Sequence, residues 1–452
     1  MSPFPSRLGG SARFALAVGL VAALGSAGGA GAQGGASGPE LQVNSYTTSS
    51  QARPRVARND AGDFVVVWES LGSSGTDVEG LSVQGRRFSA AGEPKGADFQ
   101  VNTVTYEYQA GPDVVMGPAG EFVVAWRSSY LFTPWAYYDL VAAQRFDAAG
   151  VPEGGELSIG DRVVRPPGLA RDAAGNFVVA WSTAPGGWGY DPYWRVSGAR
   201  YDAAGQFLAS FAVDSDADQP LEDPALAADG PGHFVVTWSG QASGGPDFDW
   251  GVEALRYDEE GIPQGSAFQV NVETAQIQNA PAVALDPTGR FVVAWQSLRS
   301  NGGDLSGWSI QARRFAADGT PLSGDLQVNT LTSGNQQLPR VAADALGNFL
   351  VVWQSDISNS TDTSGSSIQA RWFDADGSPL GAEFQVNTYT TGAQAEPSVA
   401  VRDLENFVVV WQSESSGGND HDSLSIHAQR FGIPFLDGFE GGDTSRWSAT
   451  VP

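Results

Sequence analysis

The chain has 452 residues, of which 41% are hydrophobic, 57 are Gly and 26 are Pro, so it can bury a sizeable core and must make many turns. It contains no Cys, which excludes disulfide bonds, thiol chemistry and a lipid anchor on Cys. A formal net charge of −26 excludes nucleic acid and anionic membrane surfaces as partners and favours solubility outside the cell.

Residues 1–32 predict a secretory signal peptide. Arg7 and Arg13 supply a positive segment, residues 14–24 form a short apolar run, and residues 30–32 (Ala-Gly-Ala) form a small-x-small cleavage site. An uncleaved anchor is the less favoured alternative, because the apolar run is too short to span a bilayer comfortably. We therefore expect a secreted protein (extracellular, at the cell surface or periplasmic) without membrane insertion. The Gly-rich residues 33–40 are expected to form a linker.

A repeated motif organises the rest of the chain. Phe-Val-Val-Val-Trp at residues 64–68 recurs with small variations, and successive motifs are 55 to 58 residues apart. A regular period of this size is typical of a repeat architecture. The motifs end at Trp68, Trp126, Trp181, Trp238, Trp295, Trp353 and Trp411.

Each repeat contains four β-like runs, which in the first repeat are residues 55–57, 64–68, 83–88 and 99–102. Tight turns of the Asp-x-x-Gly type join the first run to the second and the third to the fourth, as at residues 172–175 and 202–205. The second run is apolar on both faces, so it must be covered on both sides. The first run is made of small residues, which suit a crowded centre.

These features predict an all-β fold, a seven-bladed β-propeller of four-stranded antiparallel blades over residues 41–431. The period is too short for tandem immunoglobulin-like sandwiches. The seventh repeat lacks a fourth run after residues 426–431, whereas residues 41–44 (Leu-Gln-Val-Asn) match the fourth runs of other repeats. We therefore expect the N-terminal strand to complete the last blade and close the ring, which also removes two exposed sheet edges.

The repeat motifs resemble those of a known class of proteins. Pro-x-Val-Ala-x-Asp, Gly-x-Phe-Val-Val-x-Trp, Gln-x-x-Arg-Phe and Gln-Val-Asn-Thr are similar to the blade repeats of secreted bacterial β-propeller proteins of mostly unassigned function, with a TolB-like or WD-type layout. The sialidase Asp box is matched only loosely, and no catalytic residue carries over. The resemblance implies a fold and not a reaction.

The C-terminal tail, residues 432–452, includes Asp-Gly-Phe-Glu-Gly-Gly-Asp-Thr-Ser-Arg-Trp, which resembles a short ending seen on exported bacterial proteins. A sorting signal and a disordered remnant are both consistent with this segment.

Recognisable catalytic motifs are scarce. The chain has three His residues at scattered positions, no Gly-x-Ser-x-Gly elbow, no phosphate-binding loop and no paired-His zinc motif. A carboxylate-based glycosidase stays open, because Asp and Glu are plentiful. One Arg recurs in the third run of each repeat, and we expect it to pair with a carboxylate or carbonyl nearby. These residues are Arg87, Arg145, Arg200, Arg256, Arg314, Arg371 and Arg430.

The links between the second and third runs depart most from the repeat, and loops on a rigid scaffold often carry function. In repeats two to four they are rich in aromatic residues, which stack on sugars or grip peptides. We select as ligand-binding candidates Trp135, Tyr137, Tyr138, Trp188, Tyr190, Trp194 and Trp250. The alternative is that these rings form a lid over the blade edge. In the other repeats the links contain acids that are weak Ca²⁺ candidates, namely Asp304, Asp362, Asp420 and Asp422.

From these features we expect an exported, monomeric, non-catalytic protein that binds a carbohydrate or protein at the aromatic links of blades two to four. No cofactor other than Ca²⁺ is suggested, and no catalytic residue is assigned. The first alternative is a polysaccharide-directed hydrolase or lyase that uses carboxylates on the same face. The second is a structural surface or matrix protein.

Overall fold

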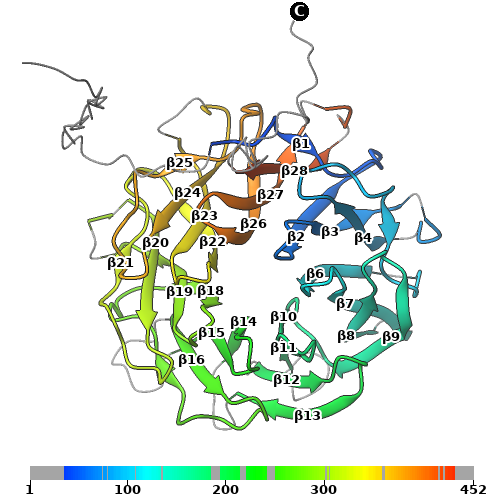
Figure 1. Cartoon of the computed structure of the whole chain (residues 1–452), viewed down its shortest axis with the longest axis horizontal. Helices are drawn as coiled ribbons and strands as arrows, with labels where there is room; N and C mark the ends of the chain where they lie inside the picture. The colour runs from blue at the N-terminus through cyan, green and yellow to red at the C-terminus, as the bar shows by residue number, and fades with distance from the viewer. Residues whose placement is uncertain are drawn as a thin grey trace, which may run out of the picture.

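The computed structural model is a ring of seven four-stranded antiparallel sheets, as the sequence predicts (Figure 1). The structure describes residues 35–432 except 74, 79, 107, 134–135, 185–193, 214–219, 242–249, 301–302, 305, 359–361, 416–417 and 421–422. The predicted signal peptide and most of the C-terminal tail lie outside the described residues. Within them, no helix is long and apolar enough to cross a membrane.

The innermost strands of the seven blades surround the centre of the ring in Figure 1. They are β2 (Gln51–Arg58), β6 (Tyr108–Met116), β10 (Gly168–Arg171), β14 (Leu221–Ala228), β18 (Gln278–Leu285), β22 (Gln336–Ala343) and β26 (Gln394–Asp403). The second strands carry the Trp motif. They are β3 (Phe64–Leu71), β7 (Phe122–Thr133), β11 (Phe177–Thr183), β15 (Phe234–Gln241), β19 (Phe291–Leu298), β23 (Phe349–Ser355) and β27 (Asn406–Glu414).

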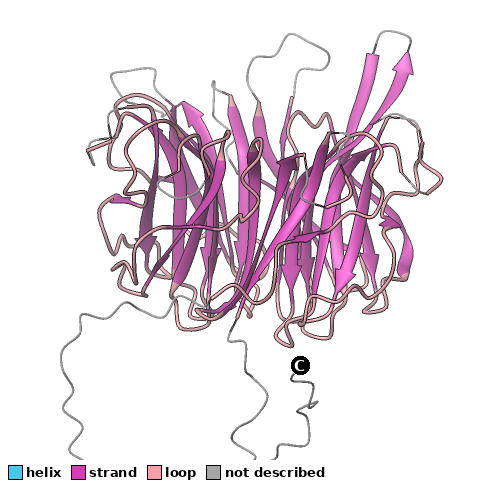
Figure 2. Cartoon of the chain, turned by 90° about the horizontal axis from the view of Figure 1, so that it is seen from above, coloured by secondary structure: helices cyan, strands magenta, loops and turns pink. Residues whose placement is uncertain are grey.

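The third and outermost strands complete each sheet. The third strands are β4 (Leu81–Phe88), β8 (Ala136–Phe146), β12 (Arg195–Tyr201), β16 (Trp250–Tyr257), β20 (Trp308–Phe315), β24 (Ser367–Phe373) and β28 (Leu424–Phe431). The outermost strands are β5 (Phe99–Gln100), β9 (Pro152–Asp161), β13 (Phe207–Ala212), β17 (Phe268–Gln269), β21 (Leu326–Gln327), β25 (Phe384–Gln385) and β1 (Leu41–Gln42). In side view the strands run between the two faces of the disc, and one strand pair extends beyond the rest (Figure 2).

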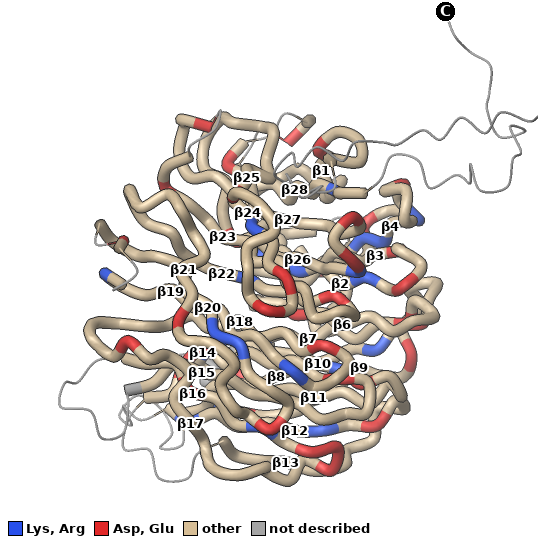
Figure 3. The backbone as a smooth tube through the Cα atoms, turned by 60° about the vertical axis from the view of Figure 1, so that its left-hand side comes forward, with Lys and Arg blue, Asp and Glu red and all other residues tan. Residues whose placement is uncertain are grey.

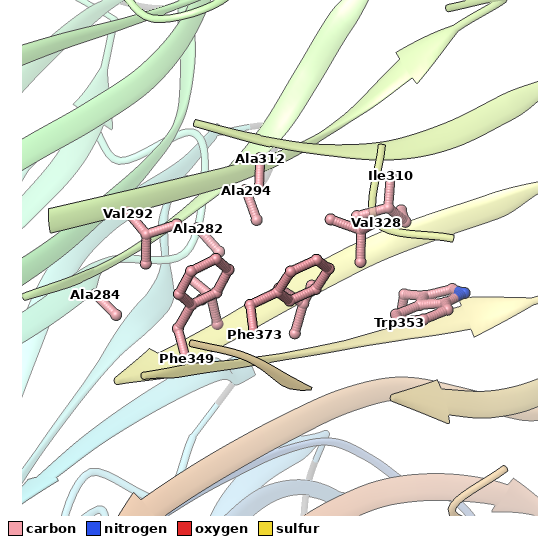
Figure 4. Close-up of a cluster of buried hydrophobic side chains, with 12 residues drawn as sticks. Ala282, Ala284, Val292, Ala294, Ile310, Ala312, Val328, Phe349, Trp353 and Phe373 are labelled. Atoms are coloured by element: carbon pink, nitrogen blue, oxygen red, sulfur yellow. The ribbon is translucent and has the colours of Figure 1, made fainter. Parts of the chain in front are cut away.

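The hydrophobic core lies between blades. Each of the seven clusters of buried side chains combines residues from two neighbouring sheets, which is why the second strand is apolar on both faces. In the cluster between blades five and six, Val292 and Ala294 of one sheet pack near Phe349 and Trp353 of the next (Figure 4). A blade therefore buries its apolar surface only when both neighbours are present.

The N-terminal strand closes the ring, as predicted. Strand β1 pairs antiparallel with β28, and its residues Leu41 and Gln42 lie opposite Ala428 and His427. The preceding segment, expected to be a linker, also follows β28, since the Ser37 N–H donates to the Arg430 carbonyl at 2.8 Å. Val43 is fully buried in the cluster that joins blades seven and one.

The recurring Arg of the third strand is structural, with one correction to the predicted alignment. Arg87 and Arg256 donate to the carbonyls of Ala148 and Ala317 in the next blade's turn, at 2.7 Å each. Arg371 does not share this position: it lies opposite Val351 of β23, and its Nη1 donates to the Val328 carbonyl of the preceding blade at 2.9 Å. A Trp stands at the predicted position in blade six, so the Arg of this repeat is displaced by one residue.

Candidate functional site

A β-bulge interrupts the innermost strand of six blades at the same place, just before a Pro. The residue before that Pro has a positive φ: 60° at Gly111 and between 51° and 54° at the non-Gly positions. The non-Gly residues at this position are Arg53, Asp223, Ala280, Leu338 and Glu396. We call these five residues and Gly111 the bulge ring.

The preceding blade holds the bulge ring in place. The N–H groups of Gly111, Leu338 and Arg53 donate to side-chain oxygens of Glu69, Gln296 and Gln412, at 3.0, 2.9 and 3.0 Å. Each acceptor directly follows the motif Trp of its own blade. These bonds across the blade interface offset the strain of a left-handed conformation, which costs about 1–3 kcal/mol at a non-Gly residue.

The bulge ring lines a central cavity of about 520 Å³. All seven innermost strands, or the segments just before them, contribute to its wall. This volume falls within the range of about 300–1,000 Å³ that is typical of ligand pockets.

Charged residues are concentrated in this cavity. Its wall includes three carboxylates and five arginines, although the whole chain is strongly acidic. Figure 3 shows acidic positions on many of the turns, whereas several basic positions lie on strands. The charged wall residues are Asp113, Asp223, Glu396, Arg53, Arg55, Arg127, Arg165 and Arg340.

Asp113 is a carboxylate of fixed orientation. Its Oδ1 accepts a hydrogen bond from the Val114 N–H at 3.0 Å, and its Oδ2 accepts one from the Leu169 N–H of the next blade at 2.9 Å. Burial raises the pKa of the Asp113 carboxyl above its ordinary value, although Arg55 and the two N–H groups oppose the shift. A buried carboxyl with a perturbed pKa in a cavity is a candidate for proton transfer.

Asp223 belongs to the bulge ring and lies beside Arg165. The Asp223 Oδ1 is 3.9 Å from Arg165 Nε, while the stronger pair of that Arg is with Glu222, at 2.5 Å. Burial raises the pKa of the Asp223 carboxyl, and the charges of Arg165 and Arg340 oppose the shift. The cavity thus contains two carboxyl groups whose pKa is raised by burial above the ordinary value.

One of the predicted aromatic residues reaches this site. The guanidinium of Arg165 lies 5.4 Å from the centre of the Trp194 ring, and the Trp194 carbonyl accepts a hydrogen bond from Leu221 N–H, just before Glu222. Trp194 therefore stands behind the Arg165 and Asp223 side of the cavity.

The other described aromatic candidates do not line the cavity. The Tyr138 hydroxyl donates to Asp161 Oδ2 at 3.0 Å, and its ring packs 5.1 Å from that of Tyr130 in the same blade. Trp250 is half-buried at the start of β16, opposite Gln241. Trp135, Trp188 and Tyr190 lie outside the described residues. Tyr137 lies in β8, and the structure does not describe its side chain.

Three of the four acidic residues that we selected as Ca²⁺ candidates are buried and bound to Asn side chains. Asp304, Asp362 and Asp420 each accept a hydrogen bond from the Asn of a Gln-Val-Asn segment, at 3.0, 2.7 and 2.8 Å. Asp422 lies outside the described residues. No group of three or more His, Asp or Glu that could hold a metal ion occurs in the described part of the chain.

The sequence analysis did not select three charged residues of the cavity wall, Arg55, Asp113 and Arg340. In the innermost strand of each blade, the position directly after the Pro holds Arg55, Asp113 and Arg340 in blades one, two and six. The same position holds only small residues in the other blades, namely Gly168, Ala225, Ala282 and Ser398. A charged residue at a position that is small in the other repeats was the signal that could have identified these residues.

No protein-family model matches the chain, and no curated protein matches it by sequence. Solved structures do match its fold. A protein of unknown function from Dyadobacter fermentans aligns with a TM-score of 0.51 and 13% identity, over 87% of this chain and 98% of that one. The polysaccharide lyase Uly1 aligns with a TM-score of 0.52 and 11% identity, over 89% and 95%. The α-L-arabinofuranosidase Arb93A from Fusarium graminearum aligns with a TM-score of 0.46 and 11% identity, over 88% and 98%.

These comparisons correct the expected function. We expected a non-catalytic binding protein, but the structure of named function that aligns with a TM-score above 0.5 is a polysaccharide lyase. The leading expectation is therefore wrong, and the comparisons favour the alternative, a polysaccharide-directed enzyme. At this low identity the shared property is the seven-bladed β-propeller fold.

Proposed function

We propose that the protein is an exported enzyme that cleaves glycosidic bonds of a polysaccharide in its central cavity. The observation that carries this proposal is the pair of carboxyl groups of raised pKa, Asp113 and Asp223, in one cavity of suitable volume. The fold match to a polysaccharide lyase supports the substrate class.

The two carboxyl groups have different surroundings, which suggests different roles. The two backbone N–H groups and Arg55 oppose the effect of burial on the pKa of Asp113, so of the two carboxyl groups we assign Asp113 as the base or nucleophile. Asp223 stands in the bulge ring and its side chain is 41% exposed, so we assign it as the acid that protonates the departing glycosidic oxygen. In hydrolysis, water supplies the hydroxyl group of the new reducing end. In a lyase, the base removes a sugar C–H proton and a double bond forms as the C–O bond breaks.

The test is a screen of the mature protein on plant, algal and bacterial polysaccharides. New reducing ends report cleavage, and ultraviolet absorption of an unsaturated product distinguishes a lyase from a hydrolase. Asp113→Asn and Asp223→Asn should each lower kcat by about 10²–10⁴-fold. Asp376→Asn is the matched control, because that side chain is 96% exposed on a turn outside the cavity. Cleavage that survives both cavity substitutions would refute the proposal.

A further inference from the structure

The charge balance of the cavity wall is opposite in sign to that of the whole protein. Arginines outnumber carboxylates by five to three in its wall, whereas the chain carries a formal charge of −26. A basic cavity in an acidic protein attracts small anions and anionic segments of a polymer more strongly than the outer surface does.

Three of the five arginines are neutralised by neighbouring acids. Arg53 pairs with Glu69 at 3.5 Å, and Arg127 pairs with Asp139 at 3.2 Å. Arg165 pairs with Glu222. The positive charge of these three side chains is therefore largely satisfied within the protein.

Arg55 and Arg340 differ from those three. Each donates one Nη1 hydrogen bond, at 2.9 Å, to the carbonyl of the Pro directly before it. Neither forms an ion pair within 4.0 Å with an acid among the described residues. Both side chains are half-buried, and both residues line the cavity wall.

The fold does not require arginine at these two positions. The equivalent residues of blades three, four, five and seven are small, and the bulge forms in blades four, five and seven all the same. Burial and then the charge of Arg55 lower the pKa of Arg340 to about 10, although the charges of Glu396, Asp113 and Asp223 oppose the shift. Burying two guanidinium groups that repel each other costs stability, and such a cost is typical of functional sites.

We propose that Arg55 and Arg340 together bind the acidic group, a carboxylate or a sulfate, of an anionic sugar in the substrate polysaccharide. This inference rests on the proposed function and names the substrate class. A guanidinium fork matches the paired oxygens of either group, and neither of these two forks forms an ion pair within 4.0 Å among the described residues. Asp113, whose charge interacts with both arginines, belongs to the same part of the cavity and contacts the sugar that carries the anion.

The test measures binding without turnover. The full mature chain carrying Asp223→Asn is titrated in a calorimeter with three oligosaccharides of equal length: an oligouronate, a sulfated neutral oligosaccharide and its unsulfated parent. We expect one anionic ligand to bind at least about tenfold more tightly than the neutral one, with an affinity that falls as salt rises. Whichever anionic ligand binds identifies the acidic group.

Substitutions then assign the contact. Arg55→Gln and Arg340→Gln, each added to Asp223→Asn, should weaken anionic binding about tenfold or more and leave neutral binding unchanged. Arg402→Gln, which removes the same charge outside the cavity wall, should change neither. Thermal melting is the second readout: because repulsion is relieved, Arg340→Gln should melt at the same temperature as its parent or higher.

Failures of the two proposals are distinguishable. Equal affinity for neutral and anionic oligosaccharides, or anionic binding unaffected by both Arg substitutions, overturns the role of Arg55 and Arg340 even if the wild-type protein cleaves glycans. Arginine-dependent anionic binding without cleavage supports the anion site and refutes the enzyme. Arg340→Gln melting well below its parent would make that arginine structural and also overturn the inference.

Discussion

The closure of the ring by the N-terminal segment can be tested at Asn44. Its Oδ1 accepts the Ile426 N–H at 2.8 Å, and its Nδ2 donates to Asp420 Oδ2 at 2.8 Å. Asn44→Ala leaves the buried N–H without this acceptor and removes one partner from the carboxylate. At about 1–3 kcal/mol for each of these two groups, the direct loss is about 2–6 kcal/mol.

Asn44 also holds the closing strand itself. Only two residues of β1 pair with β28, so loss of this anchor should let the strand fray and expose Val43, which is fully buried. That burial contributes about 1.5–3 kcal/mol, which brings the expected destabilisation to about 3.5–9 kcal/mol. Such a loss is a large fraction of a typical total stability of about 5–15 kcal/mol.

Asn102 provides a matched control inside blade one. Its Oδ1 accepts Val83 N–H at 2.8 Å and its Nδ2 donates to Asp77 Oδ2 at 2.6 Å, while its strand is tethered at both ends by the chain. Urea unfolding followed by Trp fluorescence should therefore give a loss of about 2–6 kcal/mol for Asn102→Ala, smaller than that for Asn44→Ala because no buried Val is exposed. Equal losses would contradict the idea that the closing strand frays, and no loss for Asn44→Ala would refute its role in closure.

Three further predictions concern pH and the cavity. Burial tends to raise the pKa of Glu40, but hydrogen bonds from His427 and from backbone N–H groups prevail and hold it below its ordinary value. The stability that Glu40 contributes is therefore fully present above about pH 4.5 and is lost as pH falls through the lowered pKa, so the melting difference between wild type and Glu40→Gln should vanish in acid. Because the acid form of Asp223 is required, cleavage should fall as pH rises through its raised pKa, and Asp223→Asn should remove this alkaline limb from the pH–rate profile. Trp194→Ala should raise KM several-fold by releasing Arg165, whereas Trp250→Ala should not.

Each of these has a contrary outcome. A Glu40→Gln melting difference that persists unchanged in acid would show that the carboxylate charge is not the stabilising feature. An alkaline limb retained in residual Asp223→Asn activity would assign the acid to another group. Equal KM values for the two Trp variants would show that Trp194 does not contribute to substrate binding in the cavity.

The sequence predicted the scaffold because the scaffold repeats. Seven copies of an apolar strand ending in Trp report the blade count, and the orphan residues 41–44 match the outer strand missing from blade seven. Each of these signals depends on residues close in sequence or on a regular period, which a single chain reveals without coordinates.

The candidate site was harder to predict, because it depends on residues far apart in sequence. Arg55, Asp113 and Arg340 are single charged departures in short strands, and only convergence of the seven innermost strands places them in one cavity. The aromatic composition of the links predicted a ligand-binding site there, yet Trp194 alone among the described candidates lies beside a cavity residue. The composition of a loop shows only that its sequence is unusual, whereas the closure of the ring determines which side chains lie close together.

The bulge ring allows the residues of the cavity wall to vary without a change in the fold. Its backbone conformation is set by the following Pro and by the side chain that the preceding blade supplies, so the residue at each position can vary without moving the strands. Left-handed φ values admit Gly, Asp and Asn readily and disfavour β-branched residues. A combinatorial library at positions 53, 111, 223, 280, 338 and 396 would therefore diversify ligand chemistry on an unchanged core, which makes this propeller a scaffold for engineered recognition.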